Sequence, residues 1–331
     1  MITLGIESSC DDTAAAVLRG GREVLSERVS AQAAEHQRFG GVVPEFAARM
    51  HQETILPLIK SVMDEARAKM SGGIDLIAVT RGPGLMGSLM VGVLTARALG
   101  SAWGVPVTGV NHIEGHIFAN FIADESLSPP FICLVVSGGH TEILLARGWG
   151  DYVILGATRD DAAGEAFDKG AKLLGLPYPG GAVIDGLSRK GNDRAFNFPV
   201  PLKNTDEIEF SFSGLKTALL WKLKKLSPDD VQTRINDICA SYQAAIVESL
   251  MAKLELAVRK TGIRRVAISG GVAANSALRA AVQSKKGKWD VFIPPAAHCT
   301  DNAAMIAAAG AAAWTRGVRM DAIAPDPSLH L

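Results

Sequence analysis

The sequence predicts an α/β fold assembled from two similar halves. Glycine clusters punctuate the chain at residues 82–84, 138–139, 180–181 and 270–271. Each cluster follows or joins an apolar run of strand length, such as residues 132–136, and long helical patterns such as residues 244–258 lie between them. Strands, glycine turns and helices in alternation are typical of the α/β class.

Both halves open on the same pattern of strand, polar turn and strand. The first copy lies in residues 2–18, with its turn at 8–13, and the second lies in residues 131–146, with its turn at 137–141. A pattern that returns after about 130 residues indicates a duplicated domain.

Length and composition also favour two domains. The 331 residues are 48% hydrophobic, which is enough for a large core. We expect residues 1–110 to form lobe I, and residues 111–299 to form lobe II with the metal and nucleotide loops. Residues 300–331 should return to lobe I, so that the C-terminal helix packs there.

The charge of the chain is balanced. It has 34 basic and 34 acidic residues, so no overall field attracts a nucleic acid or a membrane. Between Lys253 and Lys288, however, nine Lys or Arg accompany a single acid, Glu255. Such a stretch is either a solvated helix face or a surface that binds phosphate.

Cysteine usage and apolar patterning favour a cytoplasmic protein. The four cysteines have no C-x-x-C spacing, which indicates reduced thiols. No basic region precedes an apolar stretch at the N-terminus, so a signal peptide is not expected. The most membrane-like segment, residues 85–105, contains Arg97 and several glycines and predicts a buried helix rather than a membrane span.

A histidine pair is the strongest chemical signal. His112 and His116 are four residues apart, so in a helix their imidazoles lie on one face and make half of a transition-metal site. A peptidase with the H-E-x-x-H motif has its Glu directly after the first His. Here the acid is Glu114, about 200° around a helix from His112, which disfavours a peptidase.

Polar and glycine-rich turns predict a nucleotide site between the two lobes. Turns of small residues expose backbone N–H groups, which bind phosphate oxygens. The turns at 8–13 and 137–141 are joined by a third loop at 269–275. This arrangement resembles the actin, Hsp70 and sugar-kinase superfold (ASKHA), with mixed sheets flanked by helices. No G-x-x-x-x-G-K-S/T run occurs in the chain, so a P-loop is not expected.

Six motifs occur in the order of one family. They are IESSCDDT at 6–13, GGVVPE at 40–45, NHIEGH at 111–116, VSGGHT at 136–141, DDAAGEAFDK at 160–169 and CTDN at 299–302. Together they resemble the bacterial tRNA N6-adenosine threonylcarbamoyltransferase family, formerly described as O-sialoglycoprotein endopeptidases. The resemblance covers essentially the whole chain. Asp12 stands where such proteins often have Glu, a change that keeps the charge.

The resemblance implies an activity and a set of site residues. The reaction is transfer of a threonylcarbamoyl group from threonylcarbamoyl-AMP to N6 of adenosine 37, in tRNAs that read codons beginning with A. The implied metal is one Fe(II) per chain, with Zn(II) as an alternative, on His112, His116 and Asp301. The implied substrate contacts are Val136, Ser137, Gly138, Gly139, His140, Asp168, Gly181, Asp185 and Asn275. Implied protein partners are a smaller metal-free paralogue and an ATPase subunit.

Residue chemistry gives several of these positions a second interpretation. Asp301 lies at a predicted helix start and is either a metal ligand or an N-cap. Asn275 is either a substrate contact or a cap, Asp168 is either a contact or part of a solvated acidic face, and Gly181 is either a ribose contact or part of a turn.

Proton transfer has three candidate residues: His140, Asp11 and Asp12. The rival functions are a small-molecule kinase of the same superfold and a metallopeptidase. A kinase needs an acidic residue that activates the acceptor and a divalent ion on ATP, but no histidine pair. A third rival, a scaffold without catalysis, is disfavoured by the intact metal motifs.

Overall fold

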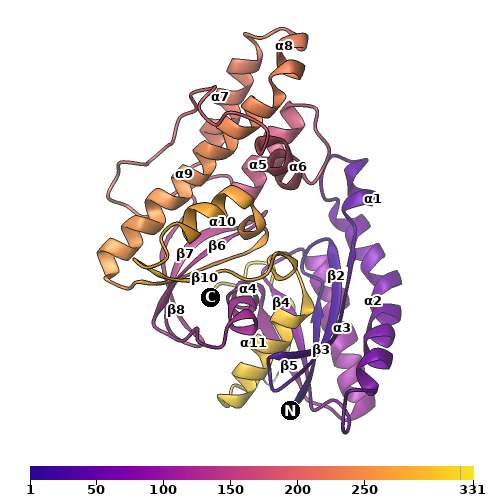
Figure 1. Ribbon diagram of the computed structural model, residues 1–331. Coiled ribbons are helices and arrows are strands. Elements are labelled where there is room, and N and C mark those ends of the chain that lie inside the picture. Colours follow the sequence, from indigo (N-terminus) through magenta and orange to yellow (C-terminus); the bar gives the residue numbers. More distant parts are fainter. Residues whose placement is uncertain (321) are drawn as a thin grey trace. The chain divides into compact units, whose positions relative to one another are not determined.

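The chain forms two compact units in a computed structural model, which describes residues 1–320 and 322–331 (Figure 1). Unit 1 contains residues 1–127 and 301–331, and unit 2 contains residues 128–300. The boundary expected near Val110 lies instead after Leu127, because α4 (His112–Ala123) packs against α11 (Ala303–Thr315) in unit 1. The histidine pair therefore belongs to unit 1, not to lobe II as expected.

Unit 1 is built on one five-stranded sheet. Its elements are β1 (Ile2–Glu7), β2 (Asp12–Arg19), β3 (Glu23–Ala31), α1 (Ala33–Gln37), α2 (Pro44–Arg67), β4 (Leu76–Gly82), α3 (Met86–Trp103), β5 (Val107–Asn111), α4 and α11. The strand order is β3-β2-β1-β4-β5, in which β3, β2 and β1 are antiparallel and β1, β4 and β5 are parallel.

Unit 2 repeats this plan. Its elements are β6 (Phe131–Val136), β7 (Thr141–Gly148), β8 (Asp151–Ala157), α5 (Ala163–Leu173), α6 (Gly180–Ser188), α7 (Ser213–Leu223), α8 (Pro228–Thr233), α9 (Ile235–Thr261), β9 (Arg265–Ser269), η1 (Gly271–Ala274), α10 (Ser276–Gln283), β10 (Asp290–Phe292) and η2 (Ala296–His298). The strand order β8-β7-β6-β9-β10 matches that of unit 1, with the same parallel and antiparallel pairs. The predicted duplication is confirmed.

The two faces of the unit 1 sheet differ in side-chain size. Leu4 and Ile6 of β1 join a cluster with α2 and α3, because alternate residues of a strand point to opposite faces. Gly5 lies on the other face, where a Cβ atom would come within 2.2 Å of the Ala303 carbonyl oxygen. The Ala-rich helix α11 therefore lies directly on β1, β4 and α4. This close packing holds the start of α11 at the end of the sheet.

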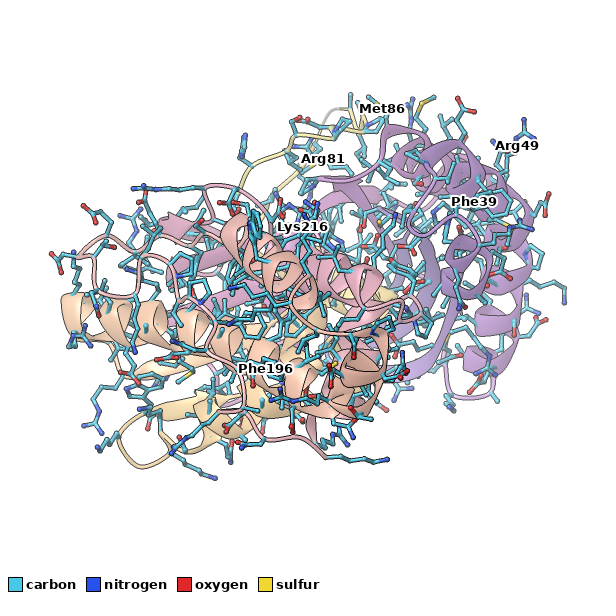
Figure 2. All side chains as sticks on the ribbon, turned by 90° about the horizontal axis from the view of Figure 1, so that it is seen from above. Phe39, Arg49, Arg81, Met86, Phe196 and Lys216 are labelled. Carbon is cyan, nitrogen blue, oxygen red and sulfur yellow. The ribbon has the colours of Figure 1, made fainter. Side chains whose placement is uncertain are left out.

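Helix α3 is only half buried, although a buried helix was expected over these residues. Met86, Met90 and Leu94 recur on its outer face and are exposed, while Leu89 and Val93 pack into the core. Met86 is labelled in Figure 2. None of the described helices is long and apolar enough to cross a membrane. The four cysteines are free thiols, as expected.

Candidate metal centre and nucleotide loops

Helix α4 presents the two histidines in the predicted way. Asn111 caps the helix, and its Oδ1 accepts the backbone N–H of Ile113 at 2.8 Å. His112 is the first helical residue, and His116 follows one turn later with its ring centroid 4.6 Å from that of His112. Both imidazoles are buried. The spacing in the sequence therefore does become a shared helix face.

Asp301 completes a group of three. Its Oδ1 lies 3.5 Å from His112 Nε2 and 3.4 Å from His116 Nε2. Asp301 does not cap α11, because Asn302 is the N-cap and accepts the backbone N–H of Met305 at 2.9 Å. The capping interpretation of Asp301 is thus wrong, and its carboxylate faces the histidines.

The donor set and its spacing fit a transition-metal ion. The three ligand atoms lie within 4.8 Å of one another. Two ligands each about 2.1 Å from one ion at a tetrahedral angle lie about 3.4 Å apart. The His116 ring is completely buried, and among the described residues its Nδ1 has no hydrogen-bond partner while its Nε2 has only the Asp301 carboxylate, 3.4 Å away. A buried nitrogen without a well-formed hydrogen bond is costly, and a cation would satisfy Nε2, which favours a cation at this position.

Glu7 is a site residue that the sequence did not reveal. It ends β1, is fully buried, and accepts the Nδ1 proton of His112 at 2.9 Å. The Thr80 hydroxyl donates to the same carboxylate oxygen at 2.6 Å. A carboxylate on Nδ1 fixes the imidazole tautomer that leaves Nε2 free for a metal. No local pattern indicates this pair, because Glu7 and His112 are more than 100 residues apart in the chain.

Electrostatic coupling is strong in this cluster. Burial lowers the pKa of His112, but Glu7 and Asp301 outweigh burial and raise it well above its usual value. Burial raises the pKa of Asp301, but the two histidines more than reverse this and hold the pKa well below its usual range. Without a metal, the carboxylates therefore retain a proton on His112. A metal has to displace that proton, since protonated imidazole is not a ligand.

The Glu114 side chain does not belong to the group formed by His112, His116 and Asp301. Its carboxylate lies 3.7 Å from Arg316, in an ion pair that joins α4 to the segment after α11. The expectation that Glu114 points away from the histidine face therefore agrees with the structure. This arrangement lacks the Glu position that an H-E-x-x-H peptidase uses as its base.

The β1–β2 turn is rigid and acidic. The His51 imidazole donates from Nε2 to the Cys10 carbonyl at 3.0 Å and accepts from the Thr13 hydroxyl at 2.7 Å. Burial, and then the charges of Asp301 and Asp11, raise the pKa of Asp12 to about 7. A carboxyl with this pKa can exchange protons near neutral pH.

The β6–β7 turn of unit 2 is open by comparison. The backbone N–H of Ser137 donates to the His140 carbonyl at 2.8 Å, which closes the turn. A Cβ atom on Gly138 or Gly139 would meet nothing within 4 Å. Gly270, in contrast, has a φ of +88° and lies against β6, where a Cβ atom would come within 2.4 Å of the Val136 carbonyl oxygen. The second and third loops of the nucleotide prediction therefore differ in role: the β6–β7 turn leaves space, and Gly270 fixes the loop after β9.

The predicted polar contacts of unit 2 anchor its loops. Asp168 Oδ1 accepts the backbone N–H of Gly180 at 2.7 Å, at the start of α6. Asp185 is buried, and its Oδ1 accepts the Ser276 hydroxyl at 2.6 Å, which joins α6 to α10. Asn275 caps α10, as its structural interpretation anticipated. Gly181 follows Gly180 in α6, beside Phe167. These residues form one connected region around α5, α6 and α10.

The basic stretch of residues 253–288 is largely engaged within unit 2. Lys253 is only 1% exposed and donates to Thr205 and to the Glu207 carbonyl. Lys285 pairs with Glu255 at 2.6 Å. Arg264 donates to the Lys288 carbonyl at 2.5 Å. These cations stabilise the unit, which weakens the expectation that they form a phosphate-binding surface.

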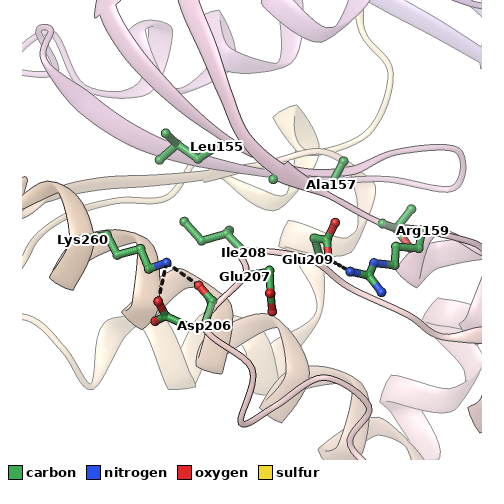
Figure 3. A pocket seen from close by; sticks show the side chains of 10 residues that line it. Leu155, Ala157, Arg159, Asp206, Glu207, Ile208, Glu209 and Lys260 are labelled. Atoms are coloured by element: carbon green, nitrogen blue, oxygen red, sulfur yellow. Dashed lines mark hydrogen bonds and ion pairs between the residues drawn. The ribbon is translucent and has the colours of Figure 1, made fainter.

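A pocket of about 600 Å³ lies elsewhere in unit 2 (Figure 3). It is formed by β8 and by residues 206–209, and the ion pairs Lys260–Asp206 and Arg159–Glu209 lie on its wall. None of the predicted substrate contacts lines it. The pocket is therefore separate from the connected region around α5, α6 and α10.

Several solved structures have the same fold as this chain. The chain is similar to HypF from T. kodakarensis, with a TM-score of 0.62 at 17% identity over 96% of this chain and 48% of that protein. It is also similar to component A of the (R)-2-hydroxyglutaryl-CoA dehydratase of Acidaminococcus fermentans, with a TM-score of 0.55 at 16% identity over 94% and 98%. These similarities show the actin, Hsp70 and sugar-kinase fold that the sequence predicted.

Sequence relatives are much closer. The protein named tRNA N6-adenosine threonylcarbamoyltransferase in Anaeromyxobacter dehalogenans strain 2CP-1 is 53% identical over 322 residues, which are 96% of this chain and 95% of that protein. Proteins with the same name in Anaeromyxobacter sp. strain Fw109-5 and Thermosipho africanus are each 50% identical, over 100% and 97% of this chain and the same shares of their own lengths. The family model for tRNA N6-adenosine threonylcarbamoyltransferase (TsaD) matches residues 23–308. By this match and these identities, the chain belongs to the tRNA N6-adenosine threonylcarbamoyltransferase family.

Proposed function

We propose that the buried triad of unit 1 and the loops of unit 2 together carry out the family's transfer of a threonylcarbamoyl group to tRNA. The donor is threonylcarbamoyl-AMP and the acceptor is N6 of adenosine 37. The observation that carries the residue assignment is the convergence of His112, His116 and Asp301, with Glu7 behind His112.

The chemistry requires orientation more than strong nucleophiles. The donor is a mixed anhydride of a carbamic acid and a phosphate, so AMP is a good leaving group. The N6 amine forms a bond to the carbamoyl carbon, the bond from that carbon to the phosphate oxygen breaks, and N6 loses a proton. Holding the two reactants in place can supply about 7–11 kcal/mol of the barrier.

The metal would be held by His112, His116 and Asp301. A bound metal ion supplies a Lewis acid that polarises a carbonyl or phosphoryl oxygen. Two imidazoles and one carboxylate suit Fe(II) and Zn(II), and we propose one Fe(II) per chain with Zn(II) as the alternative. Glu7 keeps His112 in the tautomer that leaves its Nε2 lone pair available.

The adenylate suits the loops of unit 2. The β1–β2 turn carries Asp11 and Asp12, whose charges disfavour a phosphate. The turn at Ser137, Gly138, Gly139 and His140 has no acid, and its glycines leave open space. We assign the phosphate to this turn, and the adenosine to Val136, Gly181 and the region anchored by Asp168, Asp185 and Asn275.

The proton from N6 needs an acceptor near neutral pH. Asp12 is the strongest candidate, because its raised pKa of about 7 lies nearest the working range. A cation beside Asp301 would cancel one of the charges that raise this pKa, but burial, the largest cause, and the charge of Asp11 would still raise it. Asp11 and His140 remain the other candidates.

The proposed setting is the cytoplasm, with two protein partners. A smaller metal-free paralogue and an ATPase subunit would complete the machinery. The exposed apolar face of α3, formed by Met86, Met90 and Leu94, is a suitable surface for a helical partner.

Product analysis tests the proposal. The metal-loaded chain is incubated with its partners, threonylcarbamoyl-AMP and an unmodified tRNA that reads an A-starting codon, and the digested nucleosides are weighed. A threonylcarbamoyl-adenosine from position 37 is expected, and it should vanish with Asp301→Ala. A wild-type chain that cleaves a glycoprotein and forms no modified nucleoside would contradict the assignment.

A further inference from the structure

Helix α7 of unit 2 has an outer face that lies outside the proposed metal and nucleotide sites. Its exposed residues Lys216, Leu220, Trp221 and Lys224 follow one another along the helix and its C-terminal end. We call these four residues the α7 face. Lys216 is labelled in Figure 2.

The α7 face stands on a rigid support. Leu215 and Leu219, on the opposite side of the helix, are fully buried in the unit 2 core. Asp160 holds the start of the helix: its Oδ1 accepts the backbone N–H of Phe212 at 2.8 Å, and its Oδ2 accepts the Ser213 hydroxyl at 2.8 Å. Helix α7 also packs against α5, which carries Asp168. The face is therefore fixed relative to the proposed adenosine region.

The charge on this face is of one sign and is not neutralised. Residues 213–226 contain four lysines and no acid. In the described part of the chain, no carboxylate pairs with Lys216, Lys224 or Lys225. The nearest acids in the sequence are Glu209, which pairs with Arg159, and Asp229 and Asp230, of which Asp230 joins Ser227 in the cap of α8. These lysines differ in this respect from Lys253 and Lys285, which have partners within the unit.

The aromatic group of the face is unusually exposed. The Trp221 side chain is 60% exposed, more than the other exposed large apolar side chains of the described chain. The Lys224 ammonium lies 4.9 Å from the centre of its indole ring. Cations near the end of a helix also offset its dipole, but this explains neither Lys216, which lies near the start, nor the exposed indole.

An exposed indole between lysines suits an unpaired stretch of RNA. Bases stack on aromatic rings, and lysines neutralise the phosphates on either side. We propose that the α7 face binds the acceptor tRNA at single-stranded nucleotides, with Trp221 stacking on a base and Lys216 and Lys224 contacting phosphates. The inference rests on tRNA as the acceptor, and it adds the surface that holds that acceptor.

Two variants separate the stacking from the charge. Trp221→Ala should weaken tRNA binding about 5- to 150-fold with an unchanged salt dependence, because a base loses its stacking partner. The double variant Lys216→Gln, Lys224→Gln should lower the slope of log affinity against log salt by about 1.4, at about 0.7 for each lost phosphate contact. Trp221→Phe should retain most of the affinity, since a phenyl ring also stacks.

The matched control is Lys286→Gln, Lys288→Gln, which removes the same charge from two exposed lysines of unit 2. Binding of an unmodified tRNA to the full metal-loaded chain is measured by fluorescence anisotropy at several salt concentrations. Thermal unfolding checks that each variant folds. With tRNA in excess, turnover by the α7 variants should approach that of the wild type, because only the KM for tRNA changes.

Two outcomes would overturn the proposal. One is tRNA binding by the α7 variants that matches the wild type in affinity and salt slope. The other is unchanged tRNA binding together with lost association of a protein partner, which would make the α7 face a protein interface. Binding is measured without turnover, so a failed transfer reaction would count against the proposed function and leave this test intact.

Discussion

The two units share a strand order but differ in how they present polar groups. In unit 1, Glu7, His112 and His116 are buried and face one another from a strand and a helix. In unit 2, Gly138 and Gly139 lie at a turn with open space around them, while Asn275 caps α10 and Asp168 and Asp185 accept hydrogen bonds from Gly180 and Ser276. A duplicated fold therefore carries a buried group of two histidines and a carboxylate in one unit, which we propose for a cation, and an open glycine turn in the other, which we propose for the adenylate.

Removing the triad should have the largest effect. The double variant His112→Ala, His116→Ala is expected to retain no stoichiometric metal and to lose transferase activity, since Asp301 alone is a weak ligand. Elemental analysis of the purified chain measures the metal. Asp290→Asn, an exposed change in unit 2, serves as the control and should keep it. Unchanged metal in the double variant would show that the cation binds elsewhere.

Nucleotide binding should depend on unit 2. A ligand at one hundred times its dissociation constant stabilises the folded state by about 2.7 kcal/mol. Thermal unfolding of the wild type with excess adenylate should show the corresponding rise in Tm. The variants Gly139→Val and Gly271→Val should lose it, because their side chains would fill space that is open in the structure.

A third glycine provides the control for that experiment. Gly186 also has nothing within 4 Å of an added Cβ atom, but it lies further along α6. Gly186→Val should cost some stability and still show the full nucleotide-dependent shift. If Gly139→Val and Gly271→Val behave like this control, the loop assignment is wrong.

Glu7→Gln tests whether Glu7 supports metal binding by His112 in unit 1. The amide no longer orients His112 as an anion does, so metal affinity should fall about 10- to 100-fold. The same change should lower the pKa of His112, which Glu7 helps to raise. Proton competition with the metal should therefore begin at a lower pH than in the wild type. Metal titrations at pH values between 5 and 8 would reveal both effects, and an unaltered pH profile would contradict the role of Glu7.

The smallest effect is expected from Asp12. Its pKa of about 7 is above the unfolded value, so its contribution to stability is present at low pH and is lost as pH rises through about 7. We expect the metal-free wild type to lose about 1 kcal/mol between pH 5 and pH 8, after allowance for solvent exposure. Asp12→Asn should not show this loss. Denaturant unfolding at both pH values measures it, and equal slopes for the two proteins would refute the shift.

Sequence patterns predicted the features that depend on neighbouring residues, but not those that depend on contacts between residues far apart in the chain. The spacing of His112 and His116 defines a helix face by itself, and each hairpin is contained in fewer than twenty residues. The role of Glu7 depends on the end of β1 lying beside the start of α4, which no local pattern encodes. The burial of Lys253 likewise depends on residues 205–207, which fold over α9. The choice between Asp301 and Asn302 as the helix cap was a matter of one residue, which helix-start signals do not resolve.

The place of α11 in the chain has a consequence for biosynthesis. Unit 2 is inserted between α4 and α11, so a ribosome completes His112 and His116 long before it reaches Asp301. A nascent chain carries two of the three proposed ligands throughout the synthesis of unit 2, and the third arrives with the segment that also covers the sheet of unit 1. If these residues hold the proposed metal, stoichiometric metal is therefore expected only in chains whose synthesis has passed Asp301 and whose first unit has closed.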